Sequence, residues 1–141
     1  MIKPKKIRNL NQAPSSRGLP LKGKHILFAD DSPDNQFLIE AFLTSYGAKV
    51  TLANDGSEAV DKANNDEYDL VLMDIQMPKM DGYQATKVLL NQGYKTPIIA
   101  LTAHAMASER AKTKAEGFSG HITKPFDFGE LLQTLVSYKD I

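Results

Sequence analysis

Five short apolar runs recur along the chain, and each is followed by a segment whose apolar residues have helical spacing. The runs cover residues 25–29, 49–53, 69–73, 97–101 and 120–122. Apolar runs of this length between turn residues are typical of strands that are buried on both faces. Ser32, Asp55 and Asp81 carry side chains that cap helix N-termini, and each precedes one of the intervening segments. The pattern therefore predicts strands that alternate with helices.

Alternating strands and helices indicate a parallel sheet with helices on both faces, so the predicted fold class is α/β. We expect a flavodoxin-like, doubly wound five-stranded sheet, (βα)5, with strand order 2-1-3-4-5. The helices are expected at about 33–46, 55–66, 82–91, 106–116 and 127–138. In the first of them, helical spacing puts Leu38, Ala41, Phe42 and Ser45 on one face.

The N-terminal segment differs from the rest of the chain in composition. Residues 1–23 contain prolines, glycines and serines without a strand or helix period, which predicts a flexible basic arm or linker before a domain at 24–141. Residues 1–24 hold seven basic residues and no acid, so ten basic residues remain against 17 acidic ones in the body. An acidic body argues against nucleic-acid binding, and we interpret the arm as a solvated linker.

Composition narrows the chemistry further. The chain has 141 residues, 42% of them hydrophobic, which fits one globular domain. It has no cysteine, which excludes disulfides, thiolate metal sites and cysteine nucleophiles. No apolar run is long enough for a membrane span, and the N-terminus lacks the apolar centre of a signal peptide. We therefore expect a cytoplasmic protein.

Polar residues stand where the predicted strands end. They are Asp30 and Asp31 after the first strand, Asp74 after the third, Thr102 after the fourth and Lys124 after the fifth. Each feature alone is common in turns and helix caps, but the carboxyl ends of parallel strands meet at one edge, so these side chains are expected to converge. Clustered carboxylates need a cation, and an all-oxygen site suits Mg²⁺. Asp74 is the candidate nucleophile for an aspartyl phosphate, with Lys124 as countercharge and Thr102 as hydrogen-bond donor.

Four segments carry a family resemblance: 28–31, 74–82, 97–103 and 124–126, with the sequences FADD, DIQMPKMDG, PIIALTA and KPF. Together they resemble CheY-like response-regulator receiver domains, over residues 24–138. The runs that begin at Asp74 and Ala100 most resemble receivers of hybrid sensor histidine kinases. The resemblance implies a phosphoacceptor in a two-component or phosphorelay system, which takes a phosphoryl group from a sensor histidine kinase or a histidine phosphotransfer protein.

The resemblance also implies residue roles. Asp74 would be phosphorylated, and Asp31, Asp74 and the carbonyl of Gln76 would bind Mg²⁺, with Asp30 acting through a metal-bound water. Lys124 would pair with the phosphoryl group, and its peptide bond to Pro125 would be cis. The remaining implied roles are a switch hydroxyl and two positions that tune dephosphorylation: Thr102, Gln76 and His104.

The chain departs from the family at the aromatic switch position, three residues before Lys124. The family usually has Tyr or Phe there, and this chain has His121. His121 is either a switch residue that adds a titratable group or simply a half-buried strand residue. If it acts as the switch, activation should depend on pH near neutrality.

Three functions compete for these residues. A signalling switch, which is not an enzyme, would act as a monomer or weak dimer and present the helix at 106–116, the strand at 120–122 and the helix at 127–138 to a downstream protein. A Mg²⁺-dependent phosphatase or phosphotransferase would need an acid two residues after Asp74, where Gln76 stands. A flavin-binding module would place phosphate against Asp30 and Asp31, which would repel it, and the chain has no tryptophan to stack on a flavin.

Only three residues follow Tyr138. We therefore expect the chain to bind partners, to relay phosphate or to be a piece of a hybrid kinase.

Overall fold

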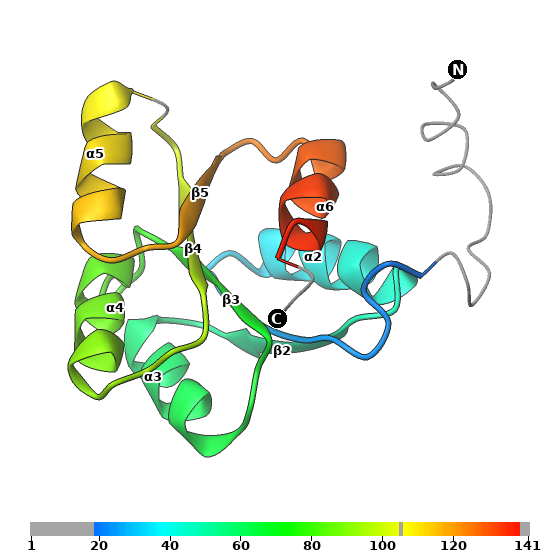
Figure 1. Ribbon diagram of the computed structural model, residues 1–141, viewed down its shortest axis with the longest axis horizontal. Coiled ribbons are helices and arrows are strands. Elements are labelled where there is room, and N and C mark those ends of the chain that lie inside the picture. The colour runs from blue at the N-terminus through cyan, green and yellow to red at the C-terminus, as the bar shows by residue number, and fades with distance from the viewer. Residues whose placement is uncertain (1–18, 105, 139–141) are drawn as a thin grey trace.

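The computed structural model describes residues 19–104 and 106–138, and it contains one parallel sheet with helices on both sides (Figure 1). The strand order is β2-β1-β3-β4-β5, as predicted. The strands are β1 (His25–Ala29), β2 (Lys49–Ala53), β3 (Leu70–Asp74), β4 (Ile98–Thr102) and β5 (Gly120–Thr123). The helices are α2 (Pro33–Ser45), α3 (Gly56–Asn65), α4 (Gly82–Asn91), α5 (Ala107–Ala115) and α6 (Phe128–Val136).

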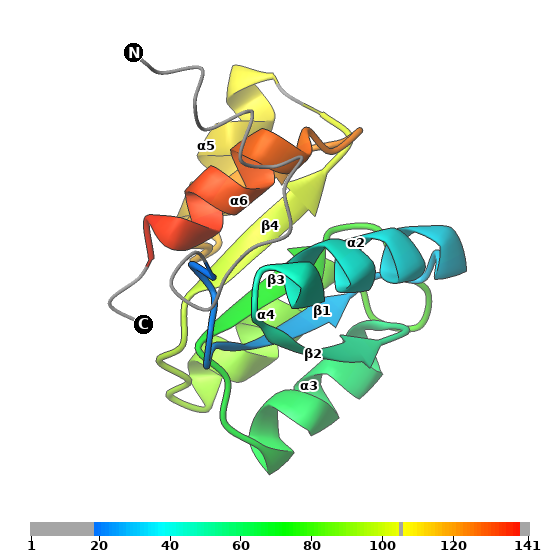
Figure 2. The same cartoon turned by 90° about the vertical axis from the view of Figure 1, so that its right-hand side faces the viewer.

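Two apolar clusters, one on each face of the sheet, form the core. On one face, Ile39 and Leu43 of α2 pack with Leu131 and Leu135 of α6. On the other face, α3 and α4 pack against the opposite side chains of the same strands (Figure 2). All five residues of β3 are buried because this strand is central and covered on both faces.

Side-chain caps start four of the five helices at the carboxyl edge of the sheet. The Ser32 hydroxyl accepts a hydrogen bond from the Asn35 amide at 3.2 Å, and Pro33 follows at the first helical position. Asp55 caps α3 and Asp127 caps α6. Asp81 and Gln84 form a reciprocal capping box at α4. These caps fix where each helix begins relative to the strand end before it.

The residues that helical spacing places on one face of α2 are not the buried residues of this helix. Ile39 and Leu43 are the buried residues of this helix, whereas Leu38 is 51% exposed and Phe37 is 71% exposed. Apolar residues occupy nearly every position from Phe37 to Leu43, so helical spacing allowed more than one packed face. Contact with the sheet decided between them, and it left two large apolar side chains on the surface.

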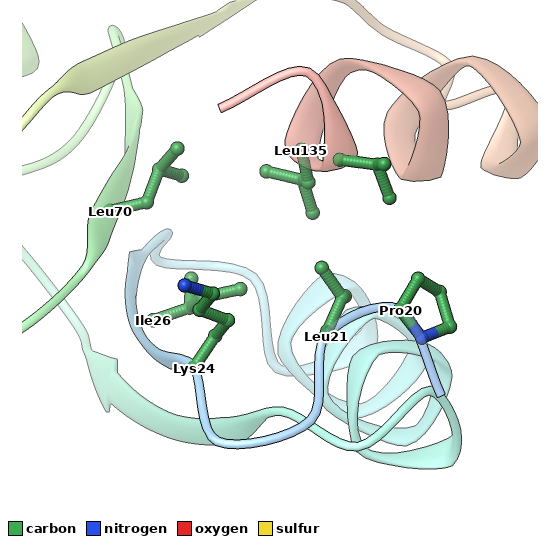
Figure 3. Close-up of a pocket in the computed structure, with 7 residues that line it drawn as sticks. Pro20, Leu21, Lys24, Ile26, Leu70 and Leu135 are labelled. Atoms are coloured by element: carbon green, nitrogen blue, oxygen red, sulfur yellow. The ribbon is translucent and has the colours of Figure 1, made fainter. Parts of the chain in front are cut away.

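The folded domain also begins earlier than the predicted boundary at residue 24. Leu21 is only 2% exposed and joins the core, and its amide donates to the Tyr46 carbonyl at 3.0 Å. Leu21 and Pro20 line a small apolar cavity with Ile26, Leu70 and Leu135 (Figure 3). This cavity lies at the amino ends of β1 and β3, away from the edge where the polar residues meet. The rest of the predicted arm, residues 1–18, lies outside the described residues.

Candidate functional site

The carboxyl edge of the sheet brings the predicted polar residues together. Asp74 is the last residue of β3 and Thr102 the last of β4, while Asp30 and Lys124 directly follow β1 and β5. β3 lies between β1 and β4, and β5 pairs with β4, so these strand ends are neighbours. The Lys124 amide donates to the Thr102 carbonyl at 2.7 Å, which extends the β4–β5 pairing into the site.

Three carboxylates form the acidic part of the site. One oxygen from each of Asp30, Asp31 and Asp74 lies within 4.8 Å of the other two. Asp30 and Asp74 are 0% and 4% exposed, while Asp31 faces solvent. An all-oxygen group with one side open to water has the donor set and the accessibility that suit Mg²⁺, which keeps several waters when it binds proteins. The residues present therefore fit this ion.

Lys124 supplies the nearest positive charge. Its Nζ lies 2.9 Å from Asp74 Oδ2 and 3.5 Å from Asp30 Oδ2. The Lys124–Pro125 peptide bond is cis, as predicted. One ammonium group is thus shared between two buried carboxylates, and it can follow a negative charge that develops on either of them.

The surroundings of Asp74 disfavour its charged form. Burial raises the pKa of the Asp74 carboxyl above its usual value, and the nearby Asp30 carboxylate adds to this rise. The hydrogen bond from Lys124 opposes both effects, as does the Gln76 amide, which donates to Asp74 Oδ1 at 3.3 Å. The carboxylate is consequently poorly solvated and depends on nearby cations, as expected for a group that reacts with a charged donor.

Sequence analysis missed two residues that orient Asp30. The Asn35 side-chain amide donates to Asp30 Oδ2 at 3.2 Å, and the Gln36 side-chain amide donates to the Asp30 carbonyl at 2.6 Å. The Ser32 backbone amide donates to Asp30 Oδ1 at 2.8 Å. The sequence does place two amide side chains, Asn35 and Gln36, in the first turn of α2, shortly after Asp30 and Asp31. This proximity was the signal that could have identified them.

The loop between β3 and α4 forms the open side of the site. Gln76 lines a cleft there with Asp31, Ile75, Met77, Pro78 and Asp81. The start of α4 packs on the backbone of Asp74, and the Gly82 amide donates to the Ile75 carbonyl at 2.8 Å. A side chain at Gly82 would overlap the Asp74 carbonyl oxygen. The close approach therefore requires glycine at this position.

The two predicted switch residues occupy different environments. Thr102 is 2% exposed, and its hydroxyl accepts a hydrogen bond from the His104 amide at 3.1 Å. His121 is half-buried in β5 and pairs with Ala100 rather than with Thr102. Burial and the nearby Arg110 lower the pKa of His121, although Glu130 and Glu109 act in the opposite direction.

Comparison with known proteins agrees with this geometry. Residues 26–136 match the response regulator receiver domain family. The chain is 37% identical over 125 residues to sensor histidine kinase GacS of Pseudomonas protegens, and 40% identical over 116 residues to signal transduction histidine-protein kinase BarA of Escherichia coli K12. The alignments cover 85% and 81% of this chain but only 14% and 13% of those proteins. The chain therefore spans about one seventh of the length of these relatives.

Solved structures show the same likeness. The receiver domain of Francisella response regulator 1452 superimposes with a TM-score of 0.81 at 30% identity, covering 84% of this chain and 98% of that one. The receiver domain of sensor histidine kinase PA1611 from Pseudomonas aeruginosa PAO1, solved with a magnesium ion in its active-site cleft, gives a TM-score of 0.77 at 40% identity, covering 84% and 99%. The chain belongs to the response regulator receiver domains of two-component and phosphorelay systems. Among the described residues, no helix combines the length and apolarity needed to cross a membrane.

Proposed function

We propose that Asp74 accepts a phosphoryl group from a phosphohistidine in a Mg²⁺-dependent reaction, and that the modification changes a protein-interaction surface. The arrangement of Asp74 beside Lys124, with Asp30 and Asp31 within 4.8 Å, carries this proposal. It combines a nucleophile, a fixed positive charge and an oxygen ligand set. Phosphoryl transfer requires mainly the positioning of groups and neutralisation of charge, which this site supplies.

In the proposed reaction, an Asp74 oxygen attacks the phosphorus atom of the donor and the phosphorus–nitrogen bond breaks, so the bonding electrons leave with the imidazole. Lys124 shifts its hydrogen bond toward a phosphoryl oxygen. Asp31, Asp74 and the Gln76 carbonyl would hold Mg²⁺, and Asp30 would act through a metal-bound water. When bound, the ion neutralises charge on the transferring group. Gln76 and His104, both exposed, are the residues proposed to tune the later attack of water.

Thr102 is the proposed switch group. Its hydroxyl already accepts a bond from the His104 amide, so its proton remains available for a phosphoryl oxygen on the neighbouring Asp74. Movement of Thr102 would pull on the segment that leads into α5. The surface formed by α5, β5 and α6 is the proposed contact for a downstream protein, and His121 lies within it.

The proposed donors are a sensor histidine kinase or a histidine phosphotransfer protein. The likeness to receiver domains within GacS and BarA supports this choice, because those proteins are histidine kinases. A hydrolytic phosphatase is less well supported, since Gln76 occupies the position where such an enzyme needs a proton donor. We therefore propose a signalling switch that assists only its own phosphorylation and dephosphorylation.

The experiment that tests this function is incubation with Mg²⁺ and acetyl phosphate, followed by intact-mass measurement. We expect one phosphoryl adduct on the wild-type chain and none on Asp74→Asn. An adduct that persists in Asp74→Asn would overturn the assignment of Asp74. Omission of Mg²⁺ should abolish the adduct, and Asp61→Asn, which changes an exposed carboxylate on α3, serves as the matched control.

A further inference from the structure

α5 is attached to the domain differently from the other four described helices. Its one buried side chain is that of Thr113, whereas each of the others buries apolar side chains. Its N-cap residue, Met106, makes no side-chain capping bond and is 67% exposed, although the other four helices all have such a bond. Apolar burial and capping therefore contribute little to holding α5 in place.

A single side chain from α4 supplies contacts that α5 otherwise lacks. The Tyr83 hydroxyl donates to Glu109 Oε2 at 2.6 Å, in the first turn of α5. Lys112 Nζ lies 4.4 Å from the centre of the Tyr83 ring. The same ring packs edge-on against Phe118, just beyond the end of α5, at 5.9 Å. Tyr83 thus contacts the first turn of α5 through Glu109, the middle of α5 through Lys112, and Phe118 beyond its C-terminal end.

The hydrogen bond is the most specific of these contacts. Its acceptor is a carboxylate, and bonds to charged acceptors are stronger than those between neutral groups. Burial and the Glu109 carboxylate raise the pKa of Tyr83, so the hydroxyl keeps the proton that it donates. The bond joins α4, which begins at the Asp74 loop, to α5, which follows Thr102 and His104 (Figure 1).

Glu109 also lies where activation would displace it. The proposed shift of Thr102 toward a phosphoryl group would pull the short connection between β4 and α5, and the first turn of α5 would move first. A displaced Glu109 would leave the fixed hydroxyl of Tyr83, because Tyr83 is held by α4 and Phe118. The bond is therefore a feature of the resting arrangement.

We propose that the Tyr83–Glu109 hydrogen bond holds α5 in its resting position, and that Tyr83 is a positioning residue that sets the balance between the resting and activated states. This inference rests on the proposed function. A ligand that favours the activated state must overcome any interaction present only in the resting state. Loss of the Tyr83 hydroxyl should therefore tighten the binding of a phosphoryl mimic.

The test compares wild type, Tyr83→Phe and Tyr68→Phe by titration with beryllofluoride in the presence of Mg²⁺, followed by amide NMR and thermal melting. Tyr68→Phe is the matched control, because it removes a tyrosine hydroxyl from a ring that packs on His25 at the opposite edge of the sheet. We expect Tyr83→Phe to lower the half-saturating beryllofluoride concentration roughly threefold to tenfold. Its α5 amide signals should also move toward their beryllofluoride-bound positions before the mimic is added. The control should match wild type.

The possible outcomes distinguish failure of this inference from failure of the proposed function. If Tyr83→Phe only lowers the melting temperature and binds beryllofluoride as wild type does, the bond is merely structural and the inference is wrong. If wild type itself does not bind the mimic, the proposed function fails and the inference falls with it. Should Tyr83→Phe not fold, Glu109→Ala removes the acceptor and keeps the ring, and it must show the same tightening for the inference to stand.

Discussion

Lys124 Nζ lies 2.9 Å from Asp74 Oδ2 and shares its charge with Asp30 at 3.5 Å. Replacing this lysine with methionine leaves two buried carboxylates without their cation. We expect Lys124→Met to lower the free energy of unfolding by about 1–3 kcal/mol in the absence of Mg²⁺. Phosphorylation by acetyl phosphate should slow by a factor on the order of 10–100. Urea unfolding and the rate of adduct formation measure the two effects.

The control for this change is Lys62→Met, which removes a lysine of α3 that pairs with Glu58 at 3.4 Å and donates to the Leu52 carbonyl of β2, and that contacts neither Asp74 nor Asp30. Its phosphorylation rate should equal that of wild type. A Lys124→Met protein that is phosphorylated at the wild-type rate would contradict the role of Lys124 as countercharge.

The charged form of Asp74 lowers the free energy of unfolding. Because its pKa is raised, the native state binds the proton more tightly than the unfolded chain, and this group lowers stability as pH rises above 3.8. Asn at this position can still accept a bond from Lys124. We expect Asp74→Asn to be more stable than wild type by about 1 kcal/mol at pH 7 without Mg²⁺, measured by urea unfolding.

Mg²⁺ should reverse that order by stabilising wild type more than Asp74→Asn, since the ion is proposed to bind the carboxylate cluster of the folded state. Addition of a chelator should remove this gain. An Asp74→Asn protein that is clearly less stable than wild type in chelator would show that burial does not disfavour the Asp74 carboxylate.

The lowered pKa of His121 predicts a dependence of stability on pH in the acidic range. The unfolded chain takes up the proton first, so the contribution is fully present above about pH 6.5 and is lost as pH falls below that value. His121→Phe should lose this component of the stability profile, while His104→Asn, which changes an exposed histidine, should retain it. Thermal melting between pH 5 and 8 measures the difference. Any gating by His121 should accordingly appear below pH 6.5 rather than near neutrality, and identical profiles for wild type and His121→Phe would exclude this role of the imidazole.

Phe37 offers a test for a protein donor. Its side chain is 71% exposed on α2, which begins at Pro33, two residues after Asp31. We expect a protein that delivers a phosphoryl group to Asp74 to contact α2, and large exposed apolar residues are expected to contribute to its binding. Phe37→Ala should slow transfer from a phosphohistidine protein roughly tenfold and leave the reaction with acetyl phosphate unchanged. Thr44→Ala, near the far end of the same helix, should affect neither rate, and equal loss with both donors would mean that Phe37 acts on the site itself.

Gly82 packs on the backbone of Asp74, the proposed phosphoacceptor. An added side chain would overlap the Asp74 carbonyl, so either α4 or the Asp74 loop must shift. We expect Gly82→Ala to cost about 1–3 kcal/mol of stability and to reduce phosphorylation at least tenfold. Gly129→Ala is the matched control, because a side chain there meets only the Asp127 side chain, at 3.3 Å, and no backbone atom, so it should change stability much less than Gly82→Ala. Wild-type phosphorylation of Gly82→Ala would contradict this account.

Local sequence signals predicted the parts of the fold that depend on nearest neighbours. The apolar runs located all five strands to within a residue or so, and Ser32, Asp55 and Asp81 cap helices as their positions indicated. The strand order followed from the alternation of strands and helices, because right-handed crossovers permit few topologies. The polar residues at the strand ends meet because parallel strands place these ends at one edge.

Contacts between distant segments could not be predicted in this way. Helical spacing left two possible faces on α2, and only packing on the sheet buried Ile39 and Leu43 while exposing Phe37. The sequence pattern placed Leu21 in the basic arm, yet its side chain lies in the core and its amide donates a hydrogen bond to the Tyr46 carbonyl.

The sequence alone determined the fold class and the chemical groups of the site, since strand periodicity, helix caps and the residues at strand ends are local properties. Only the tertiary structure decided that Lys124 pairs with the Asp74 carboxylate and that the Tyr83 side chain of α4 bonds to Glu109 of α5. Lys124 is 50 residues from Asp74, and Tyr83 is 26 residues from Glu109. Hydrogen bonds over such separations depend on side-chain geometry within a fraction of an ångström, which no residue pattern encodes.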